Sequence, residues 1–416
     1  MRTPRPMASH DHGNVIAPIQ KRPFTKRYCL ITASLCWTAS LFALLLAGKA
    51  IAAPADLLSS QTRSFSPQTK QMRLHVSGNQ LIDGNGKSVL LRGVNIASLE
   101  WCNGGEHLDE CIAAAAAWKS NIIRLPMAQD RWFGKAKGQT DGGLAYRQVV
   151  DHMVDACAAR GIYILLDLHW SDRGVWQVDG GKLGQQMMPD RNSISFWLDV
   201  ATRYKNHPNV LFDLYNEPQF YTVAEKLTYD QEWNLWRNGG RLRENVELKE
   251  KKVDADGKMV EVKRTVIQEY EAVGMQTLYD TVRHTGAQNI ILVGGNDWGY
   301  DLSGVLKGYA IKGNNLIYGS HAYPWKGGEP YKSGNDNYWD NTFGKVSENY
   351  PVLMGEIGGE EKYLQNGYGT RLMAYAQQHH LHWTAWCMHP TAGYIIKDWQ
   401  FTPTALGQLL KDELAR

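Results

Sequence analysis

Residues 210–218 read Val-Leu-Phe-Asp-Leu-Tyr-Asn-Glu-Pro, an apolar run that closes with an amide, a carboxyl group and a proline. A near-continuous apolar run of this length is typical of a strand that is buried on both faces of a parallel sheet. In a parallel barrel the carboxyl ends of the strands form one rim, where polar residues have a functional meaning by position alone. The stretch therefore predicts a buried strand that carries functional groups at its end.

The same pattern recurs along the chain. Strand-like runs span Val89–Ile96, Asn121–Met127, Tyr163–Trp170, Val210–Glu217, Asn289–Gly294, Leu316–Tyr323, Val352–Glu356 and Trp383–Met388. Helical patterns lie between or after them at Gly143–Arg160, Ser193–Tyr204, Gln268–Thr285, Gly367–His379 and Thr404–Leu414. Eight strand-then-helix repeats predict an α/β protein with a (β/α)₈ TIM barrel, because eight parallel strands close a barrel. An open, doubly wound sheet is the alternative.

Two segments depart from this repeat. Residues 73–90 alternate apolar and polar around the turn sequence at 83–86, which predicts a short N-terminal β-hairpin of the kind that closes the bottom of a barrel. Residues 241–266, after the fourth strand, are dense in Lys, Glu and Arg around the turn sequence at 254–257. This charged insertion predicts a second hairpin, and a solvated excursion is favoured over a role in substrate binding because charge runs are usually exposed faces.

The N-terminal segment, residues 1–53, predicts an export signal. A basic stretch precedes an apolar run, residues 28–48, and small residues follow at 50–53. The run is long for a cleaved signal, so an uncleaved membrane anchor is the alternative. Residues 54–70 are rich in Ser, Gln, Thr and Pro and indicate a linker, which leaves residues 71–416 for the barrel. Either processing outcome predicts a secreted or periplasmic domain, bound to a membrane only if the signal stays uncleaved.

The charge of the chain argues against a polyanionic partner. Residues 1–53 hold seven of the 45 Lys and Arg and one of the 42 Asp and Glu, so the remainder carries 38 basic and 41 acidic residues, a net charge of −3. Such a nearly neutral domain has no electrostatic footprint for nucleic acid. The 15 Trp and 20 Tyr fit either sugar-binding surfaces or a large core. An uncharged polymer is therefore the expected substrate, and a monomer the expected state.

Four cysteines follow the leader: Cys102, Cys111, Cys157 and Cys387. Cys102 and Cys111, on either side of a Gly-Gly turn, are the candidates for a disulfide in an oxidising compartment, whereas buried free thiols are expected for the other two. No CxxC or HExxH pattern and no zinc-type spacing occurs in the sequence, so neither a metal nor a cofactor is expected.

Polar or aromatic residues close most of the predicted strands, and these residues carry a family resemblance. The motifs are Leu91–Asn95, Ile123–Pro126, Asp167–His169, Leu214–Pro218, His321–Tyr323 and Met354–Gly358. In this order they resemble glycoside hydrolase family 5, the family of many cellulases, within the clan of retaining (β/α)₈ glycosidases, over residues 73–416.

The resemblance implies two catalytic carboxyl groups, Glu217 as acid/base and Glu356 as nucleophile. Cleaving a glycosidic bond needs a proton for the leaving oxygen and an anion for the developing positive carbon, so one carboxyl must stay protonated and the other ionised. A separation of about 5–5.5 Å between the two groups predicts retention of configuration, and about 6.5–9.5 Å predicts inversion. The alternative for either glutamate is a structural carboxylate.

By the same resemblance, Arg124 and Tyr323 would hold Glu356 ionised and aligned, and Asn216 would bind the sugar 2-hydroxyl. The supporting set is completed by His169 and His321, which would bind sugar hydroxyls, and Trp386, which would stack beneath the sugar. Each has a structural alternative: a buried ion pair for Arg124, an interior histidine for His169, and plain core for Trp386. Asp167 lies on the same face of its strand as His169 and is expected to form hydrogen bonds inside the barrel.

Further tryptophans in predicted rim loops are candidate stacking subsites. They are Trp101, Trp170, Trp176, Trp298 and Trp325. Trp233 and Trp236 stand at helical spacing, so helix packing and sugar platforms are both open for them.

Together these features predict a retaining endo-β-glycanase, with β-1,4-glucan as the leading substrate. Mannanase, xyloglucanase, licheninase and exo-acting enzymes share the residues named above, because the loops around the site decide among them. A transglycosylase would use the same glutamates, and a glycan-binding protein without activity would be expected to lack one of them.

Overall fold

The computed structural model describes residues 71–171, 185–326, 337–361 and 367–416. Segments 1–53 and 54–70 and residue Trp176 lie outside the described residues, so the expectations for them stay predictions. In the described ranges, no helix combines the length and the apolar character that a membrane span requires.

Within the described residues, eight parallel strands form a closed barrel in chain order. They are β3 (Arg92–Asn95), β4 (Ile122–Ala128), β5 (Tyr163–Trp170), β6 (Val210–Asp213), β9 (Ile291–Gly294), β10 (Leu316–His321), β11 (Val352–Ile357) and β12 (His382–Ala385). The last strand pairs with the first through Trp383 and Arg92, so the sheet has no edge. The TIM barrel is confirmed, and the open doubly wound sheet is excluded.

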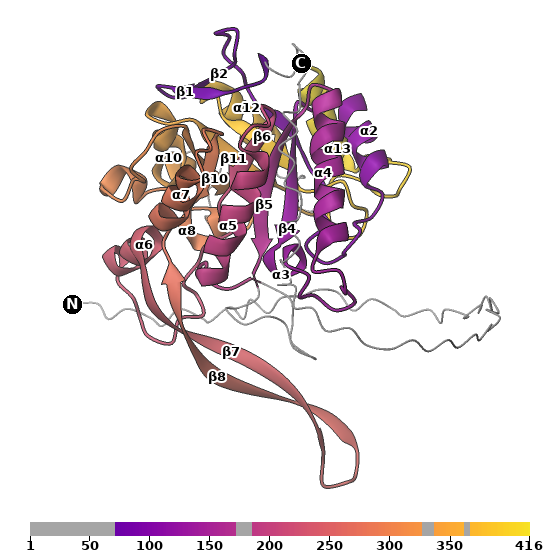
Figure 1. Cartoon of the computed structure of the whole chain (residues 1–416), viewed down its shortest axis with the longest axis vertical. Helices are drawn as coiled ribbons and strands as arrows, with labels where there is room; N and C mark the ends of the chain where they lie inside the picture. The colour runs from indigo at the N-terminus through magenta and orange to yellow at the C-terminus, as the bar shows by residue number, and fades with distance from the viewer. Residues whose placement is uncertain (1–70, 172–184, 327–336, 362–366) are drawn as a thin grey trace, which may run out of the picture. The chain divides into compact units, whose positions relative to one another are not determined.

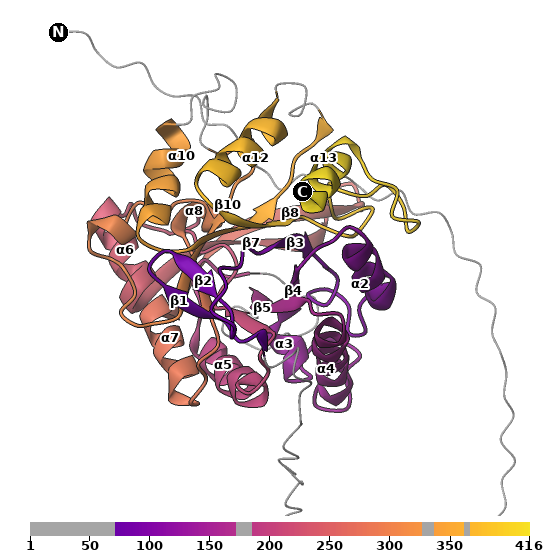
Figure 2. The ribbon, with the colours of Figure 1, turned by 90° about the horizontal axis from the view of Figure 1, so that it is seen from above.

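Helices surround the barrel on its outside (Figures 1 and 2). The larger ones are α2 (Leu108–Ala117), α4 (Leu144–Ala159), α5 (Arg191–Tyr204), α6 (Tyr229–Asn238), α7 (Met275–His284), α12 (Tyr368–Gln378) and α13 (Ala405–Ala415). Short helical segments stand in the loops: α3 (Gln129–Trp132), α8 (Asn296–Gly299), α10 (Asn337–Thr342), η1 (Val305–Lys307) and η2 (Gly344–Glu348). Each long helix packs an apolar stripe on the strands, as α5 does with Phe196, Trp197 and Val200, which are fully buried.

The amino-terminal end of the barrel is closed by the hairpin of β1 (His75–Ser77) and β2 (Gln80–Ile82). Leu81 and its neighbours Met72 and Leu74 form one apolar cluster with barrel-strand residues such as Leu165 and Leu211. The predicted closing role is therefore confirmed, and Figure 2 shows β1 and β2 lying over the barrel strands.

The predicted segment contains two turns. The first of them, which was not predicted, joins β1 to β2. It falls between Ser77 and Gln80, where Gly78 takes a left-handed φ of 60° that glycine adopts without steric cost. The predicted turn at 83–86 is also present, because Ile82 and Ser88 form an antiparallel bridge across it. Within it the Asp83 carboxylate accepts hydrogen bonds from the backbone N–H of Asn85 and Lys87.

The charged insertion is a two-stranded antiparallel ribbon of β7 (Gly239–Val253) and β8 (Met259–Val273), longer at both ends than residues 241–266. Consequently the predicted helix Gln268–Thr285 is wrong in its first part, because residues 268–273 alternate in exposure and pair with β7, and helix α7 begins only after Gly274. Figure 1 shows the ribbon leaving the barrel. Val253, Met259 and Val262 are exposed at its far end, which agrees with a solvated excursion.

Shortening the ribbon tests whether it belongs to the folding unit. Val246 and Val266 face each other in register, so replacing residues 247–265 with Asn-Gly would close a two-residue hairpin. The free energy of unfolding in urea should change by less than about 1 kcal/mol, because a two-stranded ribbon contributes little stability of its own.

A larger deletion that removes nearly the whole ribbon provides the comparison. Joining Gly239 directly to Val273 would also remove Tyr270, whose hydroxyl donates to the Met188 carbonyl (3.2 Å) and accepts from the Met188 N–H (3.1 Å). This variant should lose stability. Equal losses in both variants would show that the distal ribbon is part of the core unit.

The predicted disulfide is not formed, since Cys102 and Cys111 are both free thiols in the described chain. Cys111 lies on the buried face of α2, where its Sγ contacts the carbonyl oxygen of Met388 (3.3 Å), whereas the Cys102 Sγ is directed to the carbonyl of Gly105. The two side chains thus have separate partners. Cys157 and Cys387 are buried free thiols, as predicted.

Candidate active site

Glu217 and Glu356 meet at the carboxyl ends of the barrel strands. One side-chain oxygen of each, together with a ring nitrogen of His321, falls within a group of atoms that all lie within 4.8 Å of one another. Glu356 is the last residue but one of β11 and is buried, whereas the Glu217 side chain is 21% exposed. The backbone of Glu217 has a φ of 49°, a left-handed conformation that non-glycine residues rarely adopt and that recurs at functional sites.

Arg124 lies below this pair as a fully buried cation in the barrel interior. Its guanidinium contacts Glu356 Oε1 (2.9 Å), Asp213 Oδ2 (2.9 Å) and Asp167 Oδ2 (3.0 Å). It also donates to the side-chain oxygen of Asn216 (2.8 Å). Burial lowers the pKa of Arg124, but the surrounding carboxylates outweigh burial and raise it, so the group stays charged.

Asp167 and Asp213 share the single cation with Glu356. Burial raises the pKa of each to about 7, although Arg124 opposes the shift, because one guanidinium does not neutralise three buried carboxylates. The predicted hydrogen bonding of Asp167 inside the barrel is confirmed.

Glu356 is held from two sides. Arg124 contacts its Oε1, and the hydroxyl of Tyr323 donates to its Oε2 at 2.7 Å. Burial raises the pKa of Tyr323 well above its usual value, so the phenol keeps its proton and remains a donor. A cation and a fixed donor both stabilise the ionised form of a carboxylate.

Glu217 stands in a different environment. Its Oε1 lies 3.0 Å from Nδ1 of His321, and burial raises the pKa of the carboxyl group. Burial also lowers the pKa of His321 to about 3, so the imidazole is neutral at ordinary pH and offers one N–H and one lone pair. The two glutamates therefore differ in their nearest partners: a cation lies 2.9 Å from Glu356, whereas a neutral ring lies 3.0 Å from Glu217.

The remaining predicted residues surround this pair. The ring of His169 is stacked on Trp386, with centroids 5.3 Å apart and an angle of 13°, and His169 Nδ1 lies 2.7 Å from Asp167 Oδ2. The amide of Asn216 lies 3.5 Å from Nε2 of His169, so Asn216 links His169 to Arg124. Burial lowers the pKa of His169 to about 4, which keeps it neutral.

Two members of the cluster were not predicted as site residues. Asp213 contacts Arg124 from β6, and Asn95 accepts a hydrogen bond from Arg124 Nη1 (3.2 Å) while its amide donates to the carbonyl of Gly355 (3.0 Å). A carboxylate inside the apolar run 210–214 was a usable signal for Asp213, because an unpaired charge is costly in a buried strand. Asn95 stood in a quoted motif without a role.

The candidate subsite tryptophans lie in separate aromatic groups. Trp101 is near Trp170 (centroids 6.4 Å apart), Trp298 is stacked with Tyr221 (6.4 Å), and Trp325 is stacked on Tyr323 (4.5 Å). Trp233 and Trp236 are fully buried on α6, and Trp236 Nε1 donates to the carbonyl of Gly294. Helix packing, not sugar stacking, is therefore their role.

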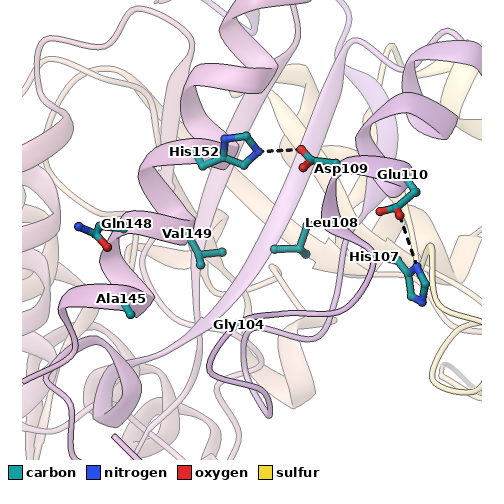
Figure 3. Close-up of a pocket in the computed structure, with 9 residues that line it drawn as sticks. All are labelled: Gly104, His107, Leu108, Asp109, Glu110, Ala145, Gln148, Val149 and His152. Carbon is teal, nitrogen blue, oxygen red and sulfur yellow. Dashed lines mark hydrogen bonds and ion pairs between the residues drawn. The ribbon is translucent and has the colours of Figure 1, made fainter. Parts of the chain in front are cut away.

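A cavity of about 570 Å³ lies away from the two glutamates, between the first turns of α2 and α4 (Figure 3). Its polar lining includes two histidine–carboxylate pairs, His152 with Asp109 (2.7 Å) and His107 with Glu110 (3.7 Å). All four side chains are 47–69% exposed, so their pairing is weak in water. Open volume alone does not identify the reactive site in this molecule.

The group of Glu217, His321 and Glu356 also has the residue types of a metal site. However, Arg124 already places a positive charge 2.9 Å from Glu356 Oε1, where a metal ion would be repelled. The donor set suits proton transfer and an anionic nucleophile better than a cation.

Comparison with known proteins agrees with this geometry. The sequence profile described as Cellulase (glycosyl hydrolase family 5) matches residues 82–392. An endoglucanase of Paenibacillus polymyxa is 25% identical over 373 residues, which cover 78% of this chain and 83% of that protein. Endoglucanase E-5 of Thermobifida fusca is 24% identical, and the match covers 80% of this chain but 59% of that protein.

Solved structures share the fold. The β-glucanase SdGluc5_26A from Saccharophagus degradans, in complex with cellotetraose, has a TM-score of 0.60 at 23% identity, covering 84% of this chain and 96% of that one. The catalytic domain of the major endoglucanase from Xanthomonas campestris pv. campestris also has a TM-score of 0.60, at 20% identity, covering 82% and 99%. Because the family profile spans most of the barrel, including both rim glutamates, the chain belongs to glycosyl hydrolase family 5, the cellulase family, and is an endoglucanase-like glycoside hydrolase.

Proposed function

We propose that the protein is a secreted or periplasmic endo-β-1,4-glucanase that works by double displacement with retention of configuration. Glu356 is the nucleophile and Glu217 is the acid/base. The observation that carries the mechanism is the closeness of the two groups, since oxygens of both lie within 4.8 Å of each other. That spacing fits the carboxyl groups of retaining enzymes, about 5–5.5 Å apart, better than the about 6.5–9.5 Å by which inverting enzymes make room for the attacking water.

In the first step a carboxylate oxygen of Glu356 attacks the anomeric carbon while Glu217 gives its proton to the glycosidic oxygen. The bond to the leaving sugar breaks, and a glycosyl ester of Glu356 forms. In the second step the ionised Glu217 takes a proton from water, the resulting hydroxyl attacks the same carbon, and Glu356 is released as a carboxylate. Two inversions at one carbon amount to retention.

The surrounding residues support these roles by position. Arg124 and Tyr323 contact the two oxygens of Glu356, so they align the nucleophile and stabilise its charge before and after the ester exists. Trp386, stacked on His169, offers a flat apolar ring for the C–H face of the sugar. Asn216 is the candidate donor for the sugar 2-hydroxyl.

The preference for β-1,4-glucan rests on the relatives, several of which are endoglucanases. It is tested by incubating the enzyme with carboxymethyl cellulose, mixed-linkage glucan, xyloglucan and mannan and measuring released reducing ends. The highest rate is expected on carboxymethyl cellulose, with a rapid fall in viscosity because cuts are internal. A higher rate on mannan or xyloglucan would reject the substrate, and oligosaccharides longer than the substrate would indicate transglycosylation.

Stereochemistry tests the mechanism independently of the substrate. Proton NMR of a cello-oligosaccharide digest during its first minutes should show the β-anomer of the new reducing end, with the α-anomer growing only by mutarotation. Early appearance of the α-anomer would mean inversion and would reject Glu356 as nucleophile.

A further inference from the structure

An ion pair that the mechanism above does not use lies in the loops beside Glu217. Lys326 Nζ is 3.0 Å from Asp297 Oδ1 and donates to the Asp297 carbonyl at 2.8 Å. The side chains are 15% and 31% exposed, so water screens the pair only in part. The hydroxyl of Tyr221 donates to the same Asp297 oxygen at 2.6 Å, and Lys326 lies over the Tyr221 ring at 5.9 Å.

The backbone brings both members of the pair to the catalytic residues. Asp297 and Trp298 are consecutive non-glycine residues with left-handed φ values of 54° and 59°. Such conformations are unfavourable and persist only where the surroundings fix them. Here the N–H of Trp298 donates to the carbonyl of Pro218, the residue after Glu217, at 3.0 Å.

Two further contacts fix the loops of Asp297 and Lys326 next to the catalytic residues. The loop passes so close to His321 that a Cβ on Gly299 would lie 3.2 Å from its ring, and His321 is the residue that contacts Glu217. On the other side, the N–H of Lys326 donates to the carbonyl of Tyr323, the residue that holds Glu356. Asp297 and Lys326 are thus anchored to the neighbours of both glutamates.

Several ionisable groups face Glu217 from the strands and loops around it. They are Arg124, Asp167, His169, Asp297, His321, Tyr323, Lys326 and Glu356. The charge of Arg124 is shared among three carboxylates of the barrel interior, and burial keeps His169 and His321 neutral by lowering the pKa of each. Among the described residues that face Glu217 from the loops, Lys326 is therefore the cation and Asp297 the opposing anion.

We propose that the Asp297–Lys326 ion pair is a positioning device that sets the pH range in which Glu217 can act as an acid. The inference rests on the proposed role of Glu217 in general acid catalysis. The two residues need not touch the reacting atoms, because they act on Glu217 through their charges.

Lys326 and Asp297 change the pKa of Glu217 in opposite directions. Burial raises the pKa of Glu217, the neighbouring His169, Lys326 and Arg124 lower it, and Asp297 raises it. Glu217 must be protonated to release the leaving sugar, so the alkaline limb of the kcat/KM profile reports its loss of that proton. Lys326→Met removes the cation and should shift this limb to higher pH. Asp297→Asn removes the anion and should shift the limb to lower pH.

The experiment records kcat/KM against pH for a cello-oligosaccharide, whose poor leaving group needs protonation. The alkaline limb is expected to move in opposite directions in Lys326→Met and Asp297→Asn. In the double variant it should lie close to its position in the parent enzyme. Lys326→Arg and Asp297→Glu keep the charges and should keep the limb in place. A merely structural role predicts lower activity for both single variants with an unmoved limb, and that result, or shifts in the same direction, would overturn the proposal.

A lysine and an aspartate that contact other tyrosines provide the matched controls. Lys307 lies over the Tyr229 ring at 4.3 Å, and Asp230 accepts a hydrogen bond from Tyr309 at 2.9 Å, so both reproduce the aromatic contacts of the pair. Lys307→Met and Asp230→Asn should leave the limb unmoved. Glu217→Gln separates the two proposals: if its remaining activity keeps the parental alkaline limb, Glu217 is not the acid, and the role of the ion pair falls with it.

Discussion

Replacing Glu356 with alanine is expected to lower kcat on the order of 10⁴-fold or more, because the covalent route through the glycosyl ester is lost. The fold should survive, since the truncation relieves one of three carboxylates that share Arg124. The measurement is single-turnover and steady-state hydrolysis of an activated aryl cello-oligoside, with thermal unfolding of each sample. Added azide should restore turnover only as a glycosyl azide of inverted configuration, formed by direct attack through the space that Glu356 vacates.

Glu100→Gln is the matched control for this variant. Glu100 is buried in the loop after β3, and burial raises its pKa to about 8, so it is already largely protonated at neutral pH and glutamine resembles it closely. Its activity should stay close to that of the parent. A Glu356→Ala variant with near-parental turnover, or with an azide product of retained configuration, would remove Glu356 from the nucleophile role.

Glu217→Gln should separate substrates by their leaving groups. A cello-oligosaccharide needs a proton on its leaving oxygen, so its kcat/KM should fall by about 10²–10⁴-fold, the usual contribution of general acid catalysis. A dinitrophenyl glycoside leaves as a stable anion and should lose less than about tenfold in the glycosylation step. Parallel kinetics on both substrates provide the comparison.

Glu106→Gln tests whether any change at a rim glutamate has this effect. Glu106 accepts a hydrogen bond from Trp101 Nε1 at 2.9 Å, and its other carboxylate oxygen lies 3.4 Å from Nε2 of His389. Its variant should change both substrates to a similar, small extent. Equal losses on the two substrates in Glu217→Gln would contradict its assignment as the acid.

The barrel could be predicted from the sequence because its strands have one environment. Every strand is buried between helices and the barrel interior, so runs such as 163–170 and 210–217 are almost wholly apolar until their carboxyl ends. The repeat of such runs with amphipathic helices leaves few other folds. Placing Glu217, Glu356 and Tyr323 on one rim, with Arg124 below them in the barrel interior, follows from that topology.

Local boundaries were less predictable. Residues 268–273 resemble the start of a helix in composition, yet they pair with residues 239–244 because a long ribbon precedes α7. Cys102 and Cys111 are close in sequence, but α2 directs the Cys111 side chain into the core. In both cases a partner distant in sequence, not the local pattern, decides the conformation.

The sequence by itself predicted the fold class and the polar rim, because apolar periodicity and residue type at strand ends are local properties, and the family resemblance of its motifs singled out the two glutamates on that rim. Only the tertiary structure decided which ionisable groups contact each other: Asp213 and Arg124, His321 and Glu217, and Asp297 and Lys326. Proton affinity depends on burial and on charges a few ångströms away in space, and those neighbours come from different strands and loops. The sequence therefore supplies the two carboxyl groups, and the fold sets the proton affinity of each by the groups that it places around them.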